Sequence, residues 1–493
     1  MTEQALALAM LAIPVATAAL MPAMPSGRAT DRLNLAGATL TAALALVLAV
    51  VAIAAAPGVA ARGGWFVLDP AAGVFLALAA TIGLVSAAVS PAYLRHAGRS
   101  WFGERRSHVW YYVAFNLFWA ALLALPLADN LAVAWLLIEA TTAASALLVA
   151  FSGNRSALEA GWKYLVLTTL GLAVALFGIV VLYAAADAGP SGLARLDWQS
   201  LARAAPDLPP EATLTAFVLI VVGLASKVGW APVHNWLPDA HSEAPPPISA
   251  MLSAALLPTV LLIAWRTELA VGPAVGEVAV RQLFLGFGLL SLAVSVPFLW
   301  RPLPWKRLLA YSSLEHMGIL ALGIGFGTPL AIAGVVVHLA GHGIAKALGF
   351  YAAIPLLRQL PASAKAPPRG VARASRSTAA AMAVSLLSLA ALPPSPLFVS
   401  EAMILLGGMQ AGLLAVVAVA AVLLALSFLG LAHALVEGLL GRRRRPGRRP
   451  SPRSARLVGA LAAVAATALL AVTVAAYALP GSDLVEALLR SGG

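Results

Sequence analysis

Residues 213–232, TLTAFVLIVVGLASKVGWAP, decide the fold class. Nearly all of their side chains are apolar, and the one charged side chain, Lys227, stands close to the end of the run. About 20 such residues are enough for a helix to cross the roughly 30 Å of hydrocarbon in a bilayer. Because a lysine at that depth is costly without a partner or a task, the stretch predicts a membrane-spanning helix with a functional charge.

Apolar stretches of similar length recur along the whole chain. Of its 493 residues 61% are hydrophobic and only 11% charged, which is typical of a protein dissolved in lipid. We therefore predict an all-α polytopic membrane protein with about fourteen transmembrane helices. The predicted spans are 5–25, 35–56, 67–89, 108–127, 130–152, 160–186, 212–232, 245–265, 280–300, 305–326, 329–357, 377–409, 411–438 and 457–479. The first has no basic segment before it, so we expect a spanning helix there and not a cleaved signal.

The composition also limits the chemistry of the chain. It contains no cysteine, which excludes disulfides, thiolate-bound zinc and iron–sulfur ligation within it. No glycine pattern typical of a nucleotide-binding loop follows a predicted strand. We expect no cofactor in this chain and no catalytic redox centre of its own, so any redox centre would belong to a partner.

The basic residues are distributed unevenly between the two predicted sides of the membrane. The formal charge is +12, and most of the 32 lysines and arginines fall on one side, including the run from Arg442 to Arg456. The other side is predicted to hold Arg62, Arg195, Arg203, Arg266, Arg281 and Arg490. The positive-inside rule makes the richer side cytoplasmic and places both termini outside a prokaryotic inner membrane. Arginines in such loops meet anionic headgroups, so we expect no nucleic-acid partner.

Three basic residues are left once the others have been assigned to the two sides of the membrane, and all three are lysines within predicted spans: Lys163, Lys227 and Lys346. Arginine stays charged in proteins, whereas a buried lysine can give up its proton. This division favours proton transfer as the task of the buried lysines.

Other ionisable residues share these spans. Glu139 lies in the middle of one span, and Glu401 follows the proline-rich run LPPSPLFVS. His338, His342 and Lys346 recur at steps of four, which places them on one face of a helix. Ionisable groups within a membrane indicate function by default, so these residues are the predicted proton-transfer groups. Glu315 and His316 are accessory candidates, expected nearer the cytoplasmic end.

Some of these residues have a second interpretation. Glu159 and Lys163 are four residues apart, which fits a structural salt bridge as well as a transport role. His338 and His342 have a spacing compatible with zinc, but the sequence offers no evident third ligand, so no metal is expected. His433 is expected to be an interfacial histidine or one whose hydrogen bonds are satisfied within the protein.

Two proline-interrupted segments predict broken helices in spans seven and twelve. They are KVGWAPVHNWLPDAHSEAPPP, residues 227–247, and LSLAALPPSPLFVSE, residues 387–401. Such pairs indicate a transporter built from inverted repeats. The predicted organisation is helices 1–3 in residues 1–107, inverted five-helix repeats in 108–268 and 269–440, and a basic loop with the last helix in 441–493.

Three motifs together resemble those of the antiporter-like subunits of respiratory complex I, Mrp cation/proton antiporters and membrane-bound hydrogenases. They are LAVAWLLIEATT around Glu139, SKVGWAPVHNWLPDAHSEAPPPISAML around Lys227 and HLAGHGIAKALGF around Lys346. The strings IEATT, ALEAGWKY and PPSPLFVSE are most similar to hydrogenase-4 component F.

The resemblance implies that Glu139 and Lys227 form a pair and that Glu401 is the terminal acid of the path. One position departs from the pattern, because Pro258 stands where many relatives carry a lysine or histidine. A proline cannot carry a proton. The first half of the path would then need water, His234, His241 or the hydroxyls of Ser253 and Thr259.

The implied function is that of a proton-translocating membrane subunit of a complex I-like or hydrogenase-linked redox complex. Its partners would be other membrane subunits and the lipid bilayer, with protons as the transported ion and Na+ as the alternative. Three other functions stay open: a cation/proton antiporter subunit, the proton-conducting subunit of an inorganic-carbon uptake system, and a membrane scaffold that does not conduct.

Overall fold

The structure, a computed structural model, describes residues 2–95, 103–187, 196–357, 367–442 and 452–490, and it is almost entirely helical. Within these ranges, thirteen helical segments are long and apolar enough to cross a membrane. They are α1 (Glu3–Leu20), α2 (Gly27–Ala54), α3 (Pro70–Leu94), α4 (Gly103–Ala124), α5 (Leu131–Val149), α6 (Arg155–Asp187), α8 (Pro210–Val228), α10 (Pro246–Met251) continued by α11 (Leu257–Val275), α12 (Glu277–Leu299), α13 (Trp305–Phe326), α14 (Pro329–Leu357), α18 (Leu414–Leu440) and α19 (Pro452–Ala476). The predicted all-α polytopic membrane fold is confirmed.

The remaining predicted span, 377–409, forms two shorter helices. They are α16 (Arg376–Leu389) and α17 (Pro396–Gln410), separated by residues 390–395. The Ser395 hydroxyl caps α17 by accepting a hydrogen bond from the Leu397 amide, and Pro396 opens the helix. The predicted break in this span is therefore present.

The other predicted break follows α8. Gly229 ends that helix with a left-handed backbone (φ 82°), a conformation that costs glycine little. Residues 230–236 are irregular, and the chain resumes a helix as α9 (Leu237–Glu243). The Trp236 indole N–H donates to the Ser226 carbonyl oxygen at 2.6 Å, which satisfies a carbonyl near the end of α8. Buried aromatic side chains thus hold the break in place.

Helices α6 and α8 pack with their backbones in contact. A Cβ atom added at Gly223 of α8 would lie 2.4 Å from the Ala175 amide nitrogen and 2.5 Å from the Gly171 carbonyl oxygen of α6. Small residues that allow such close approach are the usual basis of helix association in membranes. Any side chain at Gly223 would push these two helices apart.

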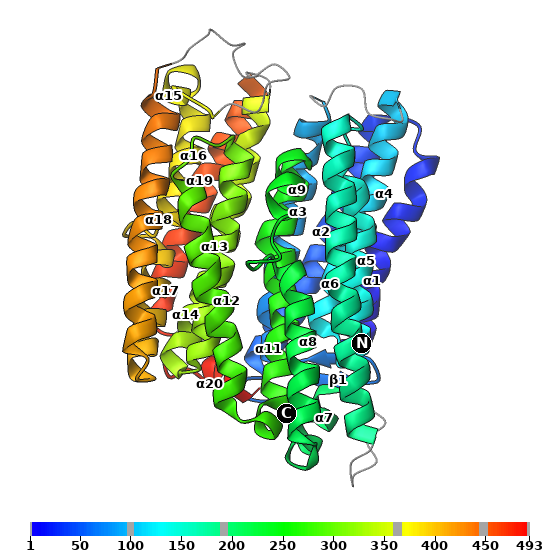
Figure 1. The fold of residues 1–493 in the computed structure, drawn as a ribbon. Helices are drawn as coiled ribbons and strands as arrows, with labels where there is room; N and C mark the ends of the chain where they lie inside the picture. Colours follow the sequence, from blue (N-terminus) through cyan, green and yellow to red (C-terminus); the bar gives the residue numbers. More distant parts are fainter. Residues whose placement is uncertain (1, 96–102, 188–195, 358–366, 443–451, 491–493) are drawn as a thin grey trace.

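The helices run roughly parallel and gather in two groups (Figure 1). Helices α1 to α6 form one group, α12 to α19 the other, and α9 and α11 lie between them. The hairpin of β1 (Ala61–Gly63) and β2 (Phe66–Leu68), α7 (Trp198–Ala204) and α20 (Asp483–Arg490) lie towards one end of the bundle. The most apolar windows of α10–α11 and α13 are completely buried, so these two helices form the core.

The prediction for one loop residue, Arg266, was wrong. Arg266 was expected in a loop beyond a span ending at residue 265, but α11 continues to Val275 and encloses it. Its side chain is fully buried and bonds both carboxylate oxygens of Asp69, at 2.7 and 2.8 Å. The helix can extend past Arg266 because the ion pair with Asp69 offsets the cost of burying the charge of the arginine.

Candidate proton path

The first polar cluster surrounds Lys227 at the end of α8. The lysine is fully buried, and its ammonium donates to the hydroxyls of Thr142 at 2.6 Å and Tyr164 at 2.5 Å. Tyr164 in turn shares a hydrogen bond of 2.8 Å with Ser145. Three helices, α5, α6 and α8, therefore supply a connected set of groups that can carry a proton.

Glu139 lies at the edge of this cluster. It is half-buried on α5 and accepts a hydrogen bond of 3.4 Å from the Thr169 hydroxyl of α6. Its charge interacts with that of Lys227, although the hydrogen bonds of the lysine go to the two hydroxyls. The structure thus brings the predicted pair into one cluster with hydroxyls as direct partners of the lysine.

The partial charges of the helix ends at the two breaks are opposite in sign to the ionisable side chains beside them. Lys227 is in the last turn of α8, where unpaired carbonyls give the helix end a partial negative charge. Glu401 is in the second turn of α17, towards the helix end where amide groups give a partial positive charge. A cation near one break and an acid near the other agree in sign with these dipoles.

The second cluster is formed by α13, α14 and α17. His338 of α14 lies 3.0 Å from His316 through ring nitrogens and 2.9 Å from the Ser400 hydroxyl of α17. Lys346 is fully buried and donates to the Leu309 carbonyl oxygen at 2.6 Å. His342 is also fully buried, with its ring centroid 5.1 Å from that of His316. The predicted histidines and lysine of α14 are therefore gathered beside the second break.

Glu315 and His316 were expected nearer the cytoplasmic end, and that expectation is wrong. Both lie midway along α13, with Glu315 3% and His316 0% exposed. Glu315 interacts electrostatically with Lys346, and His316 is bonded to His338. The two residues belong to the second cluster because α13 packs against both α14 and α17.

A cavity of about 180 Å³ opens beside the second cluster. It contains two carboxyl groups, those of Glu315 and Glu401, while the rest of its wall is apolar. The apolar lining residues are Leu389, Ala390, Ala391, Phe398, Leu424, Ala425 and Phe428. Phe398 and Phe428 are partly exposed on the outer face of the bundle, so the cavity leads outward from the cluster.

The region between the clusters contains the residues expected to compensate for Pro258. His241 of α9 is fully buried, stacks on Phe350 and interacts electrostatically with Lys346. The hydroxyls of Ser253 and Ser313 share a hydrogen bond of 2.7 Å. Pro258 itself is buried in α11 directly after a short π-helical turn, Leu252–Leu256. Hydroxyls and a histidine are thus present in the region between the two clusters.

The remaining accessory candidates differ in burial, since Glu159 and Lys163 are exposed whereas His234 is buried. Lys163 forms ion pairs with Glu159 at 2.6 Å and Asp239 at 3.4 Å, and the lysine side chain is 45% exposed. These distances support the structural interpretation of the Glu159–Lys163 pair. His234 is 9% exposed in the irregular segment after α8.

Sequence reasoning missed two partners in these clusters, Tyr164 and Ser400, and outside the clusters it missed the Asp69–Arg266 pair. Tyr164 ends the string ALEAGWKY, of which only Glu159 and Lys163 were considered as site residues. Ser400 directly precedes Glu401, so its proximity to the acid was a signal in the sequence.

Comparison with known proteins agrees with this geometry. The sequence pattern of the family "NADH:quinone oxidoreductase/Mrp antiporter, TM" matches residues 128–427. A hydrogenase-4 component F homolog of Methylacidiphilum infernorum is 32% identical over 348 residues, which are 70% of this chain and 72% of that protein. An NADH-quinone oxidoreductase subunit N of Desulforudis audaxviator is 31% identical over 385 residues, 76% of this chain and 73% of that protein.

A solved structure extends the likeness to the whole fold. In the Mrp complex from Dietzia sp. DQ12-45-1b, one chain is 20% identical, is covered completely, aligns with 99% of this chain and has a TM-score of 0.81. At that identity the likeness concerns the fold alone. The family pattern includes both clusters, from Glu139 to Glu401, and two relatives share most of their length with this chain. The chain therefore belongs to the family of NADH:quinone oxidoreductase and Mrp antiporter transmembrane subunits.

Proposed function

We propose that this chain is the proton-translocating membrane subunit of a complex I-like or hydrogenase-linked redox complex. The observation that carries the proposal is the pair of fully buried lysines, each within a polar cluster beside a helix break. The proposed proton carriers are Glu139, Lys227, His338, His342, Lys346 and Glu401. The names of the two relatives, a hydrogenase component and a quinone oxidoreductase subunit, support the redox-linked form of this function.

The electrostatic interactions between the carriers support two connected stretches of the path. Glu139 interacts with Lys227 in the first cluster, and His241 interacts with Lys346 across α9 and α14. Glu315 then lies between Lys346 and Glu401, interacting with both. Glu315 therefore joins the proposed path as a further carrier.

The coupling would use the distance between charges. Two unit charges about 4 Å apart interact by roughly 4 kcal/mol at an effective dielectric of about 20. Doubling that distance removes about half of the interaction, enough to change an equilibrium constant for proton transfer by more than tenfold. A movement of Glu139 away from Lys227 on this scale would thus favour release of the lysine's proton into the path. A partner subunit would drive that movement.

The arrangement in the membrane follows from the same proposal. We place the basic loops on the cytoplasmic side of a prokaryotic inner membrane and both termini outside. Residues 108–268 and 269–440 would form the two inverted repeats, which the helix breaks at 229–236 and 390–395 support. Residues 443–451 of the basic run lie outside the described part of the chain.

The test is proton translocation by the intact complex in proteoliposomes, with Lys227→Ala and Glu401→Gln as variants. We expect the translocation rate to fall at least tenfold in each, because a carrier is lost while the complex still assembles. Glu437→Gln is the matched control, since Glu437 is a partly exposed acid outside both clusters, paired with Arg369 at 2.9 Å. Unchanged translocation in both test variants would rule out the proposal.

Tyr164→Phe tests the role of the hydroxyl that accepts a bond from Lys227. A hydrogen bond to a charged group contributes about 1.5–3 kcal/mol, so we expect the translocation rate to change by roughly ten- to hundredfold. The fully buried Tyr164 has a control on the same helix in Tyr183, which is 41% exposed. Tyr183→Phe should behave like the wild type. Equal rates in the two variants would contradict a role for this hydroxyl.

A further inference from the structure

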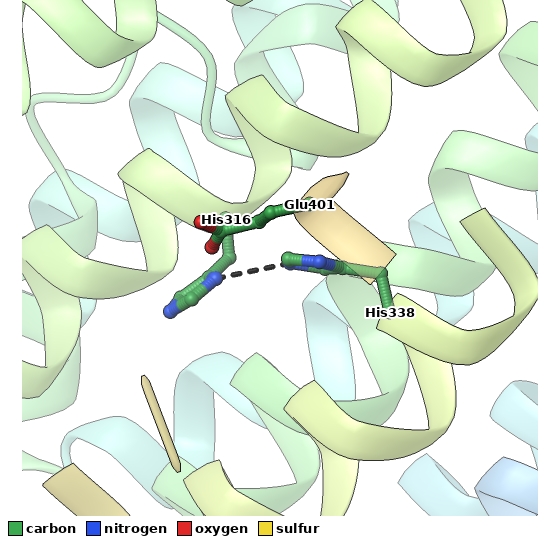
Figure 2. A group of neighbouring side chains, drawn as sticks. All are labelled: His316, His338 and Glu401. Atoms are coloured by element: carbon green, nitrogen blue, oxygen red, sulfur yellow. Dashed lines mark hydrogen bonds between the residues drawn. The ribbon is translucent and has the colours of Figure 1, made fainter. Parts of the chain in front are cut away.

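Three potential metal ligands from three helices meet in the second cluster. Nitrogen atoms of His316 and His338 and a carboxylate oxygen of Glu401 all lie within 4.8 Å of one another. Figure 2 shows the two imidazole rings joined by a hydrogen bond, with the Glu401 carboxylate directed towards them. The sequence suggested only a His338–His342 pair without a third ligand, and the fold supplies it from α13 and α17.

The distances are close to those of a tetrahedral site. Zinc–nitrogen bonds of about 2.0–2.1 Å place two ligands about 3.3 Å apart. The two histidine nitrogens are already 3.0 Å apart, and the carboxylate oxygen, within 4.8 Å of both, needs to approach by at most about 1.5 Å. Rotation of the glutamate side chain can provide that movement, because its carboxylate adjoins the cavity of about 180 Å³.

The hydrogen bonds behind the rings orient His338 as a ligand. The Ser400 hydroxyl donates its proton to the Leu397 carbonyl oxygen at 2.9 Å, so it accepts a bond from Nδ1 of His338. The lone pair of that ring is then on Nε2, which faces His316. A partner that fixes the ring and its tautomer in this way is typical of metal-binding histidines.

Buried polar atoms without a hydrogen-bond partner among the described residues lie in the same cluster as the three ligands. Both ring nitrogens of His342, which is fully buried, lack a hydrogen-bond partner among the described residues, as does Oε2 of Glu315. Buried polar groups without partners are costly, and here they stand next to a ready set of ligands. His342 or a water molecule in the cavity can complete a four-ligand site.

The charges balance as well. Glu315 and Glu401 line one cavity, and together they can supply two negative charges. A divalent cation would neutralise both, which removes the cost of two carboxylates sharing a buried space. Imidazole nitrogens favour Zn²⁺ and other first-row transition metals over Mg²⁺, Ca²⁺ or Na+.

We propose that His316, His338 and Glu401 bind a divalent transition-metal ion such as Zn²⁺, and that the bound metal blocks the second half of the proton path. The ion takes the place of the hydrogen atom between the two rings, and the proton of His316 Nδ1 moves to Nε2 of that ring. The bound nitrogens then have no lone pair with which to accept a proton. The blocking part rests on the proposed function, whereas the binding part does not.

The binding test uses the purified complex after chelator treatment, titrated with Zn²⁺ by calorimetry and with Co²⁺ by visible absorption. We expect one site per chain that weakens at least a hundredfold in His338→Gln and in Glu401→Gln. His433→Gln, which changes an exposed histidine of α18, should bind like the wild type. Ser400→Ala is a milder variant that keeps all three ligands, and we expect affinity to fall by about ten- to hundredfold.

Equal affinity in the wild type, His338→Gln and Glu401→Gln would overturn the site, and so would an equal loss in His433→Gln. Thermal unfolding of each metal-free variant verifies that it is folded, and Ser400→Ala tests the site even where a ligand variant does not fold. Blocking is measured separately, as proton translocation by the wild type at saturating Zn²⁺. Full translocation with the metal bound would overturn the blocking part, while the Lys227→Ala result tests the proposed function independently.

Discussion

Lys346→Met is expected to abolish proton translocation by the assembled complex. Lys346 is fully buried between the interacting groups His241 and Glu315, and its ammonium donates to the Leu309 carbonyl oxygen. Methionine keeps the length and apolar character of the side chain but carries no proton. The measurement is the initial rate of proton uptake into proteoliposomes, for which we expect less than a hundredth of the wild-type value.

Lys346→Arg separates proton transfer from structural support. Arginine keeps the positive charge and hydrogen-bond donors, yet it does not release a proton in proteins. We expect this variant to assemble and still not translocate. Lys163→Met serves as the matched control, because Lys163 is an exposed lysine of α6. Translocation restored by arginine would show that Lys346 acts only through its charge and hydrogen bond.

Arg266→Met is expected to lower the free energy of unfolding by about 3–5 kcal/mol, because it leaves a buried carboxylate without its partner. Arg266 is 0% and Asp69 4% exposed, and two hydrogen bonds join them. The guanidinium also donates to the Pro126 carbonyl oxygen at 2.9 Å, which ties α11 to the segment before α5. Thermal and denaturant unfolding of the purified chain, followed by tryptophan fluorescence, would measure the change.

Two controls identify the cause. Arg62→Met removes a partly exposed partner of Asp129, 3.2 Å away, and should cost about 1 kcal/mol or less. The double variant Asp69→Leu with Arg266→Met should lose less than the sum of the single variants, because it leaves no unpaired buried charge. Additive losses would contradict an interaction between the two side chains.

The sequence predicted the features that depend on local chemistry. Lys227 and Lys346 stood out because a charge in a long apolar stretch is costly wherever the chain folds. The breaks at 229–236 and 390–395 were predicted because proline removes a helix hydrogen bond at its own position. Neither inference needed to know which helices are neighbours.

The errors concern residues whose position depends on distant partners. Arg266 was assigned to a loop because its stabilising partner, Asp69, is 197 residues away in the chain. Glu315 and His316 were assigned to a helix end because hydropathy gives the ends of a span only to within several residues. The proximity of His316 to Glu401 likewise depends on how α13 packs against α17, which no pattern within either helix specifies.

The glycine contact between α6 and α8 has a mechanical consequence. With backbone touching backbone at Gly171 and Gly223, the two helices have no room to slide or rotate against each other. Tyr164 of α6 and Lys227 of α8 are therefore held in a fixed position relative to each other. In the proposed coupling, a change in the distance from Glu139 to Lys227 would therefore come from a movement of α5. The half-exposed surface of α5 would then be where a driving subunit attaches.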